Sequence, residues 1–166
     1  MTDIWIIRAG EGAFLIDEFK NRGIVSIGWG IGDLTDKNDE DIKNLLKEKY
    51  PKKSEKSIGI LAKNIINFSS TMKKGDYVIS AYPKSKKYIL GEIISDYYYS
   101  EELLDNGIDS YGIYDNFRDV KWICEIPHDG LSDGTNMSLA NPLTSYKISN
   151  NAKEEILNFI ADSCLE

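Results

Sequence analysis

The chain has 166 residues, the usual size of one domain, and 42% apolar and 28% charged residues, a composition that excludes a disordered, collagen-like or coiled-coil chain. No run approaches the roughly eighteen apolar residues that a membrane span needs, and the first residues lack signal-peptide features, so we expect a cytoplasmic protein without a membrane partner. The formal net charge of -7 at pH 7 argues, taken alone, against a nucleic-acid partner.

The charge is unevenly distributed along the sequence. From Lys43 to Lys87 there are twelve lysines and three acids, a local balance of +9 that leaves -16 for the remainder. A lysine run is commonly a solvated helix face, but segregation of this size predicts a bipolar molecule whose basic pole can hold phosphates. The lysines assigned to phosphate binding are Lys52, Lys53, Lys56, Lys63, Lys84, Lys86 and Lys87.

The first half of the chain predicts short strands and helices in alternation. An apolar strand is expected over residues 4–8, then a helix that includes Phe14 and ends at Gly23. A strand over residues 24–29 follows. Asp36 or Asn38 can cap a helix that extends to Lys49, and a second amphipathic helix is expected over residues 55–68.

The second half is richer in strands. Residues 77–82 and 88–99 predict a hairpin, residues 100–116 a long acidic loop, and residues 118–126 and 143–149 further strands. Asn150 or Asn151 can cap a last helix. Because the strands do not alternate regularly with helices, we expect an α+β fold: a small, mostly antiparallel barrel with flanking helices. Residues 1–149 would form the domain, and residues 150–166 a C-terminal helix.

Few residues are candidates for catalysis or metal binding. Cys124 and Cys164 have no CxxC spacing and are interpreted as reduced, partly buried thiols. The one histidine, His128, stands in a turn-like PHDG segment and is expected to be solvated. Lys121 and Glu125 are interpreted as a surface charge pattern rather than a nuclease site, and the glycine-rich stretches 10–12 and 28–32 lack a P-loop pattern. We therefore expect no metal, no cofactor and no enzymatic activity.

The tryptophans are the distinctive aromatic residues. Trp5 and Trp122 lie inside predicted strands and are expected to be core residues. Trp29 differs because it stands between two glycines that open space around its indole ring. A tryptophan in this setting can stack on a planar ligand, and one base stacked on one aromatic ring contributes about 1–3 kcal/mol.

Five segments, IWIIRAGEGAFLIDEF, VSIGWGIGDL, MKKGDYVISAY, YILGEI and RDVKW, occur in an order that resembles the N-terminal module of Mrr-like restriction endonucleases. This module is a relative of the EVE, YTH and PUA-like domains, and the resemblance extends from Trp5 to about Ile148. The resemblance implies a PUA-like barrel with a pocket for a base flipped out of a nucleic-acid strand. It assigns the pocket to Trp29, Asn64, and Ser80 or Tyr82, with the backbone around Arg8 and Ala9 as its edge.

The resemblance further implies a DNA-binding reader of a modified base, the specificity part of a restriction or defence system. The nuclease domain that follows the module in restriction enzymes is absent from these 166 residues, so the chain is either a free-standing reader or a fragment of a larger protein, for which a nuclease domain or a partner subunit is a possible partner. Two alternatives stay open. Relatives in the PUA-like superfamily bind RNA, and some of the ASCH type have been proposed to cut it.

Overall fold

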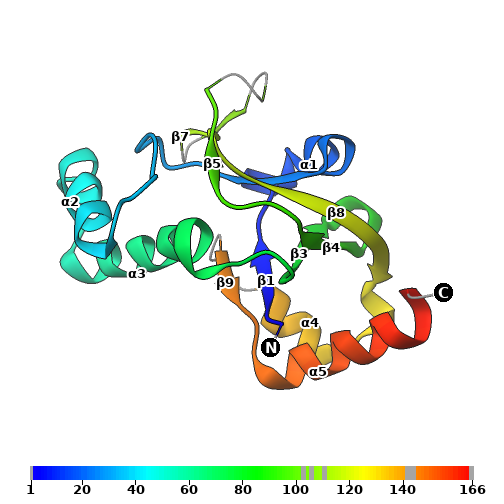
Figure 1. The fold of residues 1–166 in the computed structure, drawn as a ribbon. Helices are drawn as coiled ribbons and strands as arrows, with labels where there is room; N and C mark the ends of the chain where they lie inside the picture. The colour runs from blue at the N-terminus through cyan, green and yellow to red at the C-terminus, as the bar shows by residue number, and fades with distance from the viewer. Residues whose placement is uncertain (1, 102–103, 105–106, 110–111, 141–144, 165–166) are drawn as a thin grey trace.

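The centre of the computed structural model is a curled, mixed sheet (Figure 1), and the structure describes residues 2–101, 104, 107–109, 112–140 and 145–164. The strands lie in the order β2 (Ile24–Ile27), β8 (Asn116–Pro127), β4 (Lys87–Ile93), β3 (Tyr77–Tyr82), β1 (Ile4–Ile7) and β9 (Ser145–Lys147). A short strand, β5 (Tyr98–Tyr99), also pairs with β8. Only the β1–β3 pair of this sheet is parallel, so the sheet forms a mostly antiparallel half-barrel.

Helices flank the sheet. The longer ones are α1 (Ile16–Arg22), α2 (Asp39–Lys49), α3 (Glu55–Ile66), α4 (Asp133–Leu139) and α5 (Asn150–Phe159). Helix α3 continues as a π-helical turn, η2 (Asn67–Thr71), and α5 as η5 (Ile160–Cys164); 3₁₀ turns are η1 (Glu11–Ala13), η3 (Pro83–Ser85) and η4 (His128–Gly130). A separate small hairpin joins β6 (Ile108–Asp109) to β7 (Gly112–Ile113). The expected α+β class with flanking helices is confirmed.

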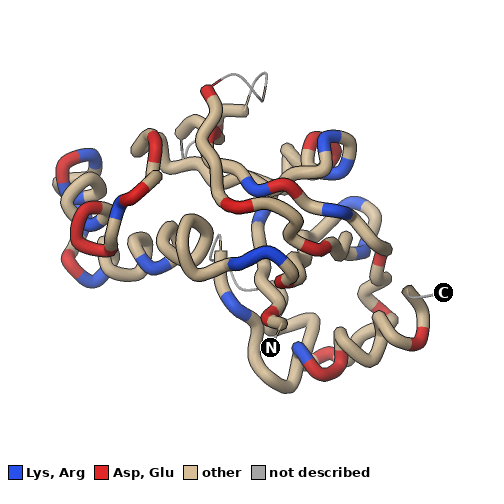
Figure 2. Tube along the Cα trace, in the orientation of Figure 1, with Lys and Arg blue, Asp and Glu red and all other residues tan. Residues whose placement is uncertain are grey.

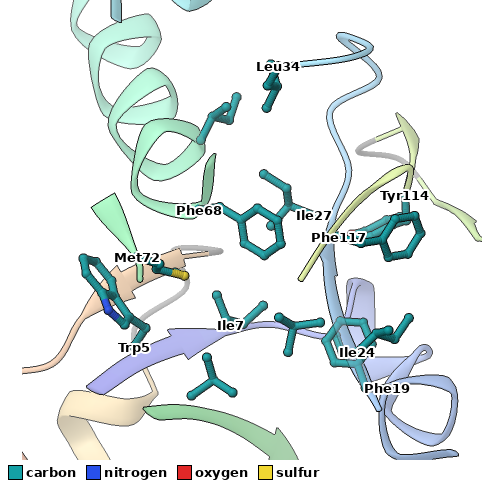
Figure 3. Packing of buried hydrophobic residues seen from close by; sticks show 14 of the residues in the cluster. Trp5, Ile7, Phe19, Ile24, Ile27, Leu34, Phe68, Met72, Tyr114 and Phe117 are labelled. Atoms are coloured by element: carbon teal, nitrogen blue, oxygen red, sulfur yellow. The ribbon is translucent and has the colours of Figure 1, made fainter. Parts of the chain in front are cut away.

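Two hydrophobic clusters lie on opposite faces of the sheet. Side chains alternate along β1, so Trp5 and Ile7 join one cluster while Ile4 and Ile6 join the other. The first cluster brings β1, β2, α1 and η2 together around buried aromatic rings (Figure 3). The second packs α4 and α5 against the sheet, so the C-terminal helix shares a hydrophobic core with β1.

Several element boundaries differ from the predictions. Helix α1 begins at Ile16, and Phe14, expected inside it, precedes it with 43% of its surface exposed. The predicted strand over residues 88–99 ends at Ile93 and resumes only as β5. Helix α5 is capped by the Ser149 hydroxyl rather than by Asn150 or Asn151. Helix α4 was not predicted, because its seven residues are too few to establish a helical period.

Asp76, in the turn before β3, connects this strand to the beginning of β1. The carboxylate is fully buried and accepts hydrogen bonds from Trp5 Nε1 (3.0 Å), Asp3 N (3.2 Å) and Lys73 N (3.2 Å). Burial alone raises the pKa of a carboxyl group, but these hydrogen bonds hold the pKa of Asp76 below its ordinary value. Trp5 is thus a core residue, as expected, whose indole also has a polar partner.

The structure corrects the interpretation of both cysteines and of the histidine. Cys124 of β8 and Cys164 of η5 form a disulfide, with Cα atoms 5.9 Å apart, so they are not reduced thiols here. The pairing joins segments that are distant in sequence, which spacing rules cannot detect. His128 is not a solvated loop residue, because its ring stacks on Tyr88 at 4.5 Å between centroids. Within the described ranges, no helix is long and apolar enough to cross a membrane.

Candidate functional site

A cavity of about 250 Å³ lies where β1 ends and the β3–β4 hairpin turns. Its walls come from four parts of the chain: the end of β1, the η1 turn, the end of β3 with η3, and the end of α4. The cavity is smaller than the roughly 300–1,000 Å³ of sites for drug-sized ligands. Its size therefore suits one small group, such as a single ring system. The residues that matter below are Arg8, Ala9, Gly10, Ala81, Pro83 and Leu139.

The backbone of the η1 turn shapes one wall of this cavity. Gly10 has φ +79°, a conformation that side-chain-bearing residues rarely adopt, and a Cβ atom there would collide with the ring of Phe14. The turn closes at Leu15, whose backbone amide donates a hydrogen bond to the Ala9 carbonyl at 2.9 Å. The RAGEG segment therefore folds as a tight turn that brings its own backbone to the cavity, rather than as a phosphate-binding loop before a helix.

The chemistry of the walls is mainly aliphatic. Among the described lining residues, Arg8 is the one charged side chain, and none is aromatic. A planar ligand would therefore be held between aliphatic side chains and backbone, with Arg8 able to supply hydrogen-bond donors. Nearby, the Asp109 carboxylate accepts hydrogen bonds from Glu11 N (3.0 Å) and from the Tyr114 hydroxyl (2.8 Å). These two donors stabilise its negative charge within the fold.

Of the six residues assigned to the base pocket, only Arg8 and Ala9 line this cavity. Ser80 is fully buried, and its hydroxyl donates to the Ile7 carbonyl at 2.6 Å. Asn64 is 5% exposed; its amide donates to Ile60 O and accepts from Ser145 N, both at 2.9 Å. The Ser80 hydroxyl therefore connects β3 to β1 and the Asn64 amide connects α3 to β9, neither residue lines the cavity, and their contact with a base stays a prediction.

Tyr82 lies between two residues that line the cavity but points elsewhere. Its hydroxyl donates to Asp17 Oδ1 at 2.8 Å, and Lys87 Nζ lies 5.4 Å from its ring centre. The hydrogen bond to the Asp17 carboxylate raises the pKa of Tyr82. Alternation along β3 explains the difference, because Ala81 and Tyr82 point to opposite faces of the strand.

Trp29 also lies outside the walls of the cavity. It has φ +78° and is half-buried, in a loop near the end of α2. The hydroxyl of Tyr50 donates to its carbonyl at 3.2 Å, and a Cβ atom at Gly112 would stand 3.2 Å from its carbonyl carbon. Gly112 thus allows two backbones to approach closely, whereas a Cβ atom at Gly28 would meet the Tyr114 ring, and the Trp29 ring packs against the first hydrophobic cluster.

The seven lysines assigned to phosphate binding form two groups instead of one basic pole. Four, all exposed, lie on the α2–α3 turn and on α3: Lys52, Lys53, Lys56 and Lys63. The other three are on the β3–β4 hairpin, whose turn lies on the right in Figure 1, whereas α2 and α3 lie on the left. Acidic residues are interspersed along α2 (Figure 2). Only the hairpin group adjoins the cavity, since Lys84 follows Pro83 directly.

A charged cluster that sequence reasoning missed lies beside the hairpin. Glu125 forms ion pairs with Lys87 (2.6 Å) and Lys20 (2.9 Å), and these two lysines lower its pKa. Lys87 is therefore neutralised locally, which leaves Lys84 and Lys86 as the exposed cations of the turn. Lys121 and Glu125 were interpreted together as a surface charge pattern on one strand. Its actual partners come from α1 and β4, a proximity that only the fold creates.

Comparison with known proteins gives a family but no activity. The family model described as a domain of unknown function (DUF8426) matches residues 5–148, and no curated protein matches the chain. Two solved structures align over nearly the whole chain. A hypothetical protein from Leishmania major has a TM-score of 0.48 and 14% identity, over 98% of this chain and 96% of its own. A protein from Pseudomonas syringae has a TM-score of 0.44 and 12% identity, over 94% and 98%. The chain belongs to the DUF8426 family.

Proposed function

We propose that this protein is a nucleic-acid reader that binds one base, turned out of its strand, in the cavity at the end of β1. The observation that carries the proposal is the position of the cavity. A recess large enough for one ring system lies beside a turn with two exposed lysines, Lys84 and Lys86, and has Arg8 on its wall. Phosphates of the strand would contact the turn while the base enters the recess.

The free-energy cost of base flipping determines how strongly the cavity must bind the base. Extruding a base costs a few kcal/mol, which contacts in the pocket must offset. With aliphatic walls, the offset would come from apolar burial of the base faces and from hydrogen bonds to its edge. Backbone groups of Arg8 and Ala9 are the candidates for the edge contacts, as the family resemblance implies. Aromatic stacking on Trp29 is no longer part of the proposal.

The proposal extends to a PUA-like fold and to a biological role in defence. A half-barrel with flanking helices and with the β3–β4 hairpin directly after the GD dipeptide at residues 75–76 is compatible with a PUA-like, EVE-related module. On that basis we infer that the ligand is DNA carrying a modified base and that the protein supplies specificity to a restriction or defence system, without catalysis of its own. RNA is the alternative ligand, which a requirement for the 2′-hydroxyl would identify.

Filling the cavity tests the proposal. Ala81 lines the cavity, whereas Ala161 is exposed on η5, so Ala81→Phe and Ala161→Phe form a matched pair of substitutions. Fluorescence anisotropy with labelled DNA and RNA, single-stranded and duplex, with and without modified bases, should show loss of base-selective binding only in Ala81→Phe. Equal binding by both folded variants would contradict a base site in this cavity. Cleavage of any labelled strand by the wild-type protein would contradict the absence of catalysis.

A further inference from the structure

A second cavity, of about 500 Å³, lies on a different part of the molecule. Its walls come from the loop over residues 34–37, from the π-helical turn η2 at the end of α3, and from the segment between β4 and β5. Polar and charged side chains dominate these walls, including Lys37, Ser69, Ser70, Lys73, Asp96 and Arg118. None of them has a role in the base site.

Arg118 is an unusual wall residue because its charge is buried without an ion pair among the described residues. It is 3% exposed. Its guanidinium donates to three carbonyls: Phe68 O at 2.7 Å, Met72 O at 2.9 Å and Ser95 O at 3.3 Å. A guanidinium has five N–H groups and stays charged at neutral pH, so two N–H groups have no acceptor in the described part of the chain.

The C-terminal end of η2 offsets part of the free-energy cost of burying the Arg118 charge. Phe68 lies in η2 and Met72 caps it, so two of the three carbonyls belong to a helix C-terminus, which carries a partial negative charge. This capping explains why the arginine can be buried there. It does not neutralise a full charge, and buried charges are normally paired.

The Ser69 hydroxyl is a second, independent observation at the same wall. Its oxygen is buried and has no hydrogen-bond partner within the described residues, although Ser69 lines the cavity. A buried hydroxyl without a partner loses its hydrogen bonds to water and gains none in return, so it calls for a function or a ligand. Ser69 also belongs to a π-helical turn, a distortion that is frequent at functional sites.

The charges at the rim favour an anion over a cation. Lys37 and Lys73 add two exposed cations to Arg118, while Asp36 and Asp96 add two carboxylates. Asp96 is 84% exposed and lies 3.8 Å from Lys74 Nζ, and Lys73 Nζ lies 3.3 Å from the buried Asp76 carboxylate. Arg118, at the base of the cavity, forms no ion pair within the described residues, although the carboxylates of Asp96 and Asp76 attract it from a longer distance.

We propose that this cavity binds a phosphate group, with Arg118 at its base and with Ser69 and Lys37 as further donors. Guanidinium, ammonium and hydroxyl groups are the donors that phosphate oxygens prefer. The phosphate could belong to a free phosphate compound or to the backbone of a nucleic acid, since both present the same oxygens. The site is argued from its own residues, so it does not depend on the base site proposed above.

Titration with inorganic phosphate, followed by amide NMR, tests the site without any nucleic acid. Arg118 is unsuitable as the main variant because its removal can unfold the protein. Ser69→Ala and Lys37→Gln leave the core intact, and their matched controls, Ser163→Ala and Lys47→Gln, change exposed residues on η5 and α2. We expect phosphate to shift the amides of residues 34–37 and 69–73, and each test variant to weaken binding about tenfold, the effect of one lost charge-assisted hydrogen bond.

The two sources of phosphate are distinguished by competition with a labelled oligonucleotide. Displacement of the oligonucleotide by phosphate in wild type, but not in Ser69→Ala, would assign the site to the nucleic-acid backbone. Binding of phosphate without displacement would assign it to a free phosphate compound. The proposal is overturned if phosphate causes no shifts around the cavity, or if Ser69→Ala and Lys37→Gln bind it as tightly as their controls.

Discussion

Replacing Asp76 by asparagine should destabilise the protein, because the carboxylate connects β1 to β3. The substitution keeps the shape, removes the charge, and replaces one acceptor oxygen by an amide donor that faces other donors. Three nitrogens donate to this carboxylate, and Lys73 Nζ lies 3.3 Å away. A hydrogen bond to a charged group contributes about 1.5–3 kcal/mol, so losing one or two of them should cost about 2–4 kcal/mol of unfolding free energy.

Urea unfolding, followed by tryptophan fluorescence, measures this loss. With a slope of about 2 kcal/mol/M, the midpoint should fall by about 1–2 M. The matched control is Asp129→Asn, at an exposed site, which should change the free energy by less than about 0.5 kcal/mol. A midpoint for Asp76→Asn equal to that of the control would refute the assigned role.

The stabilisation by Asp76 should also depend on pH in a predictable direction. The pKa of Asp76 is lowered in the folded state, so its stabilisation is present above the ordinary carboxyl pKa of about 4. This stabilisation is lost as the pH falls through the folded-state pKa. The free-energy difference between wild type and Asp76→Asn should therefore be constant near neutral pH and shrink only in acid. A difference that grows on acidification would contradict the lowered pKa.

Three further predictions follow from other contacts. Reducing the Cys124–Cys164 disulfide should lower stability by about 2–4 kcal/mol, so a reductant should lower the melting temperature of wild type but not of Cys124→Ser. Gly91→Ala should cost about 1–3 kcal/mol in a urea titration, because the added Cβ would stand 2.7 Å from Trp122 Cε3 at the bulge between β4 and β8; an unchanged midpoint would contradict this. Charge reversal of Lys84 and Lys86 to Glu should weaken oligonucleotide binding and flatten its salt dependence, whereas the same change at Lys52 and Lys53 should have little effect; the opposite ranking would place the phosphates on α2 and α3.

Local patterns in the sequence predicted most of the individual elements. The stripe of apolar residues on α3, the Asn38 cap of α2 and the β3–β4 hairpin all appear where their periodicity and capping residues indicate. These features depend on near neighbours, so they can be read along the chain. Helix α4 was missed, although Ser132 is an N-cap residue that could have indicated its start.

The candidate site was harder to predict because it depends on contacts between distant segments. Ser80 and Asn64 look like available polar groups in sequence, but pairing of β3 with β1 and the approach of residue 145 occupy both of them. The lysines from 43 to 87 lie in one stretch of the sequence. Because the chain crosses the molecule between α3 and the β3–β4 hairpin, they form two separate groups in the structure (Figure 2). The disulfide is a third case, since its cysteines meet only after α5 has packed on the sheet.

Amide and indole NMR during titration with a base-containing ligand tests the central claim most directly. The probe is the oligonucleotide that binds best in the anisotropy screen, added to uniformly labelled protein. We expect shifts at Arg8, Ala9, Gly10 and Ala81 around the first cavity, with the indole signal of Trp29 unchanged. Shifts confined to Trp29 and its neighbours in the loop, with none around the first cavity, would contradict the central claim.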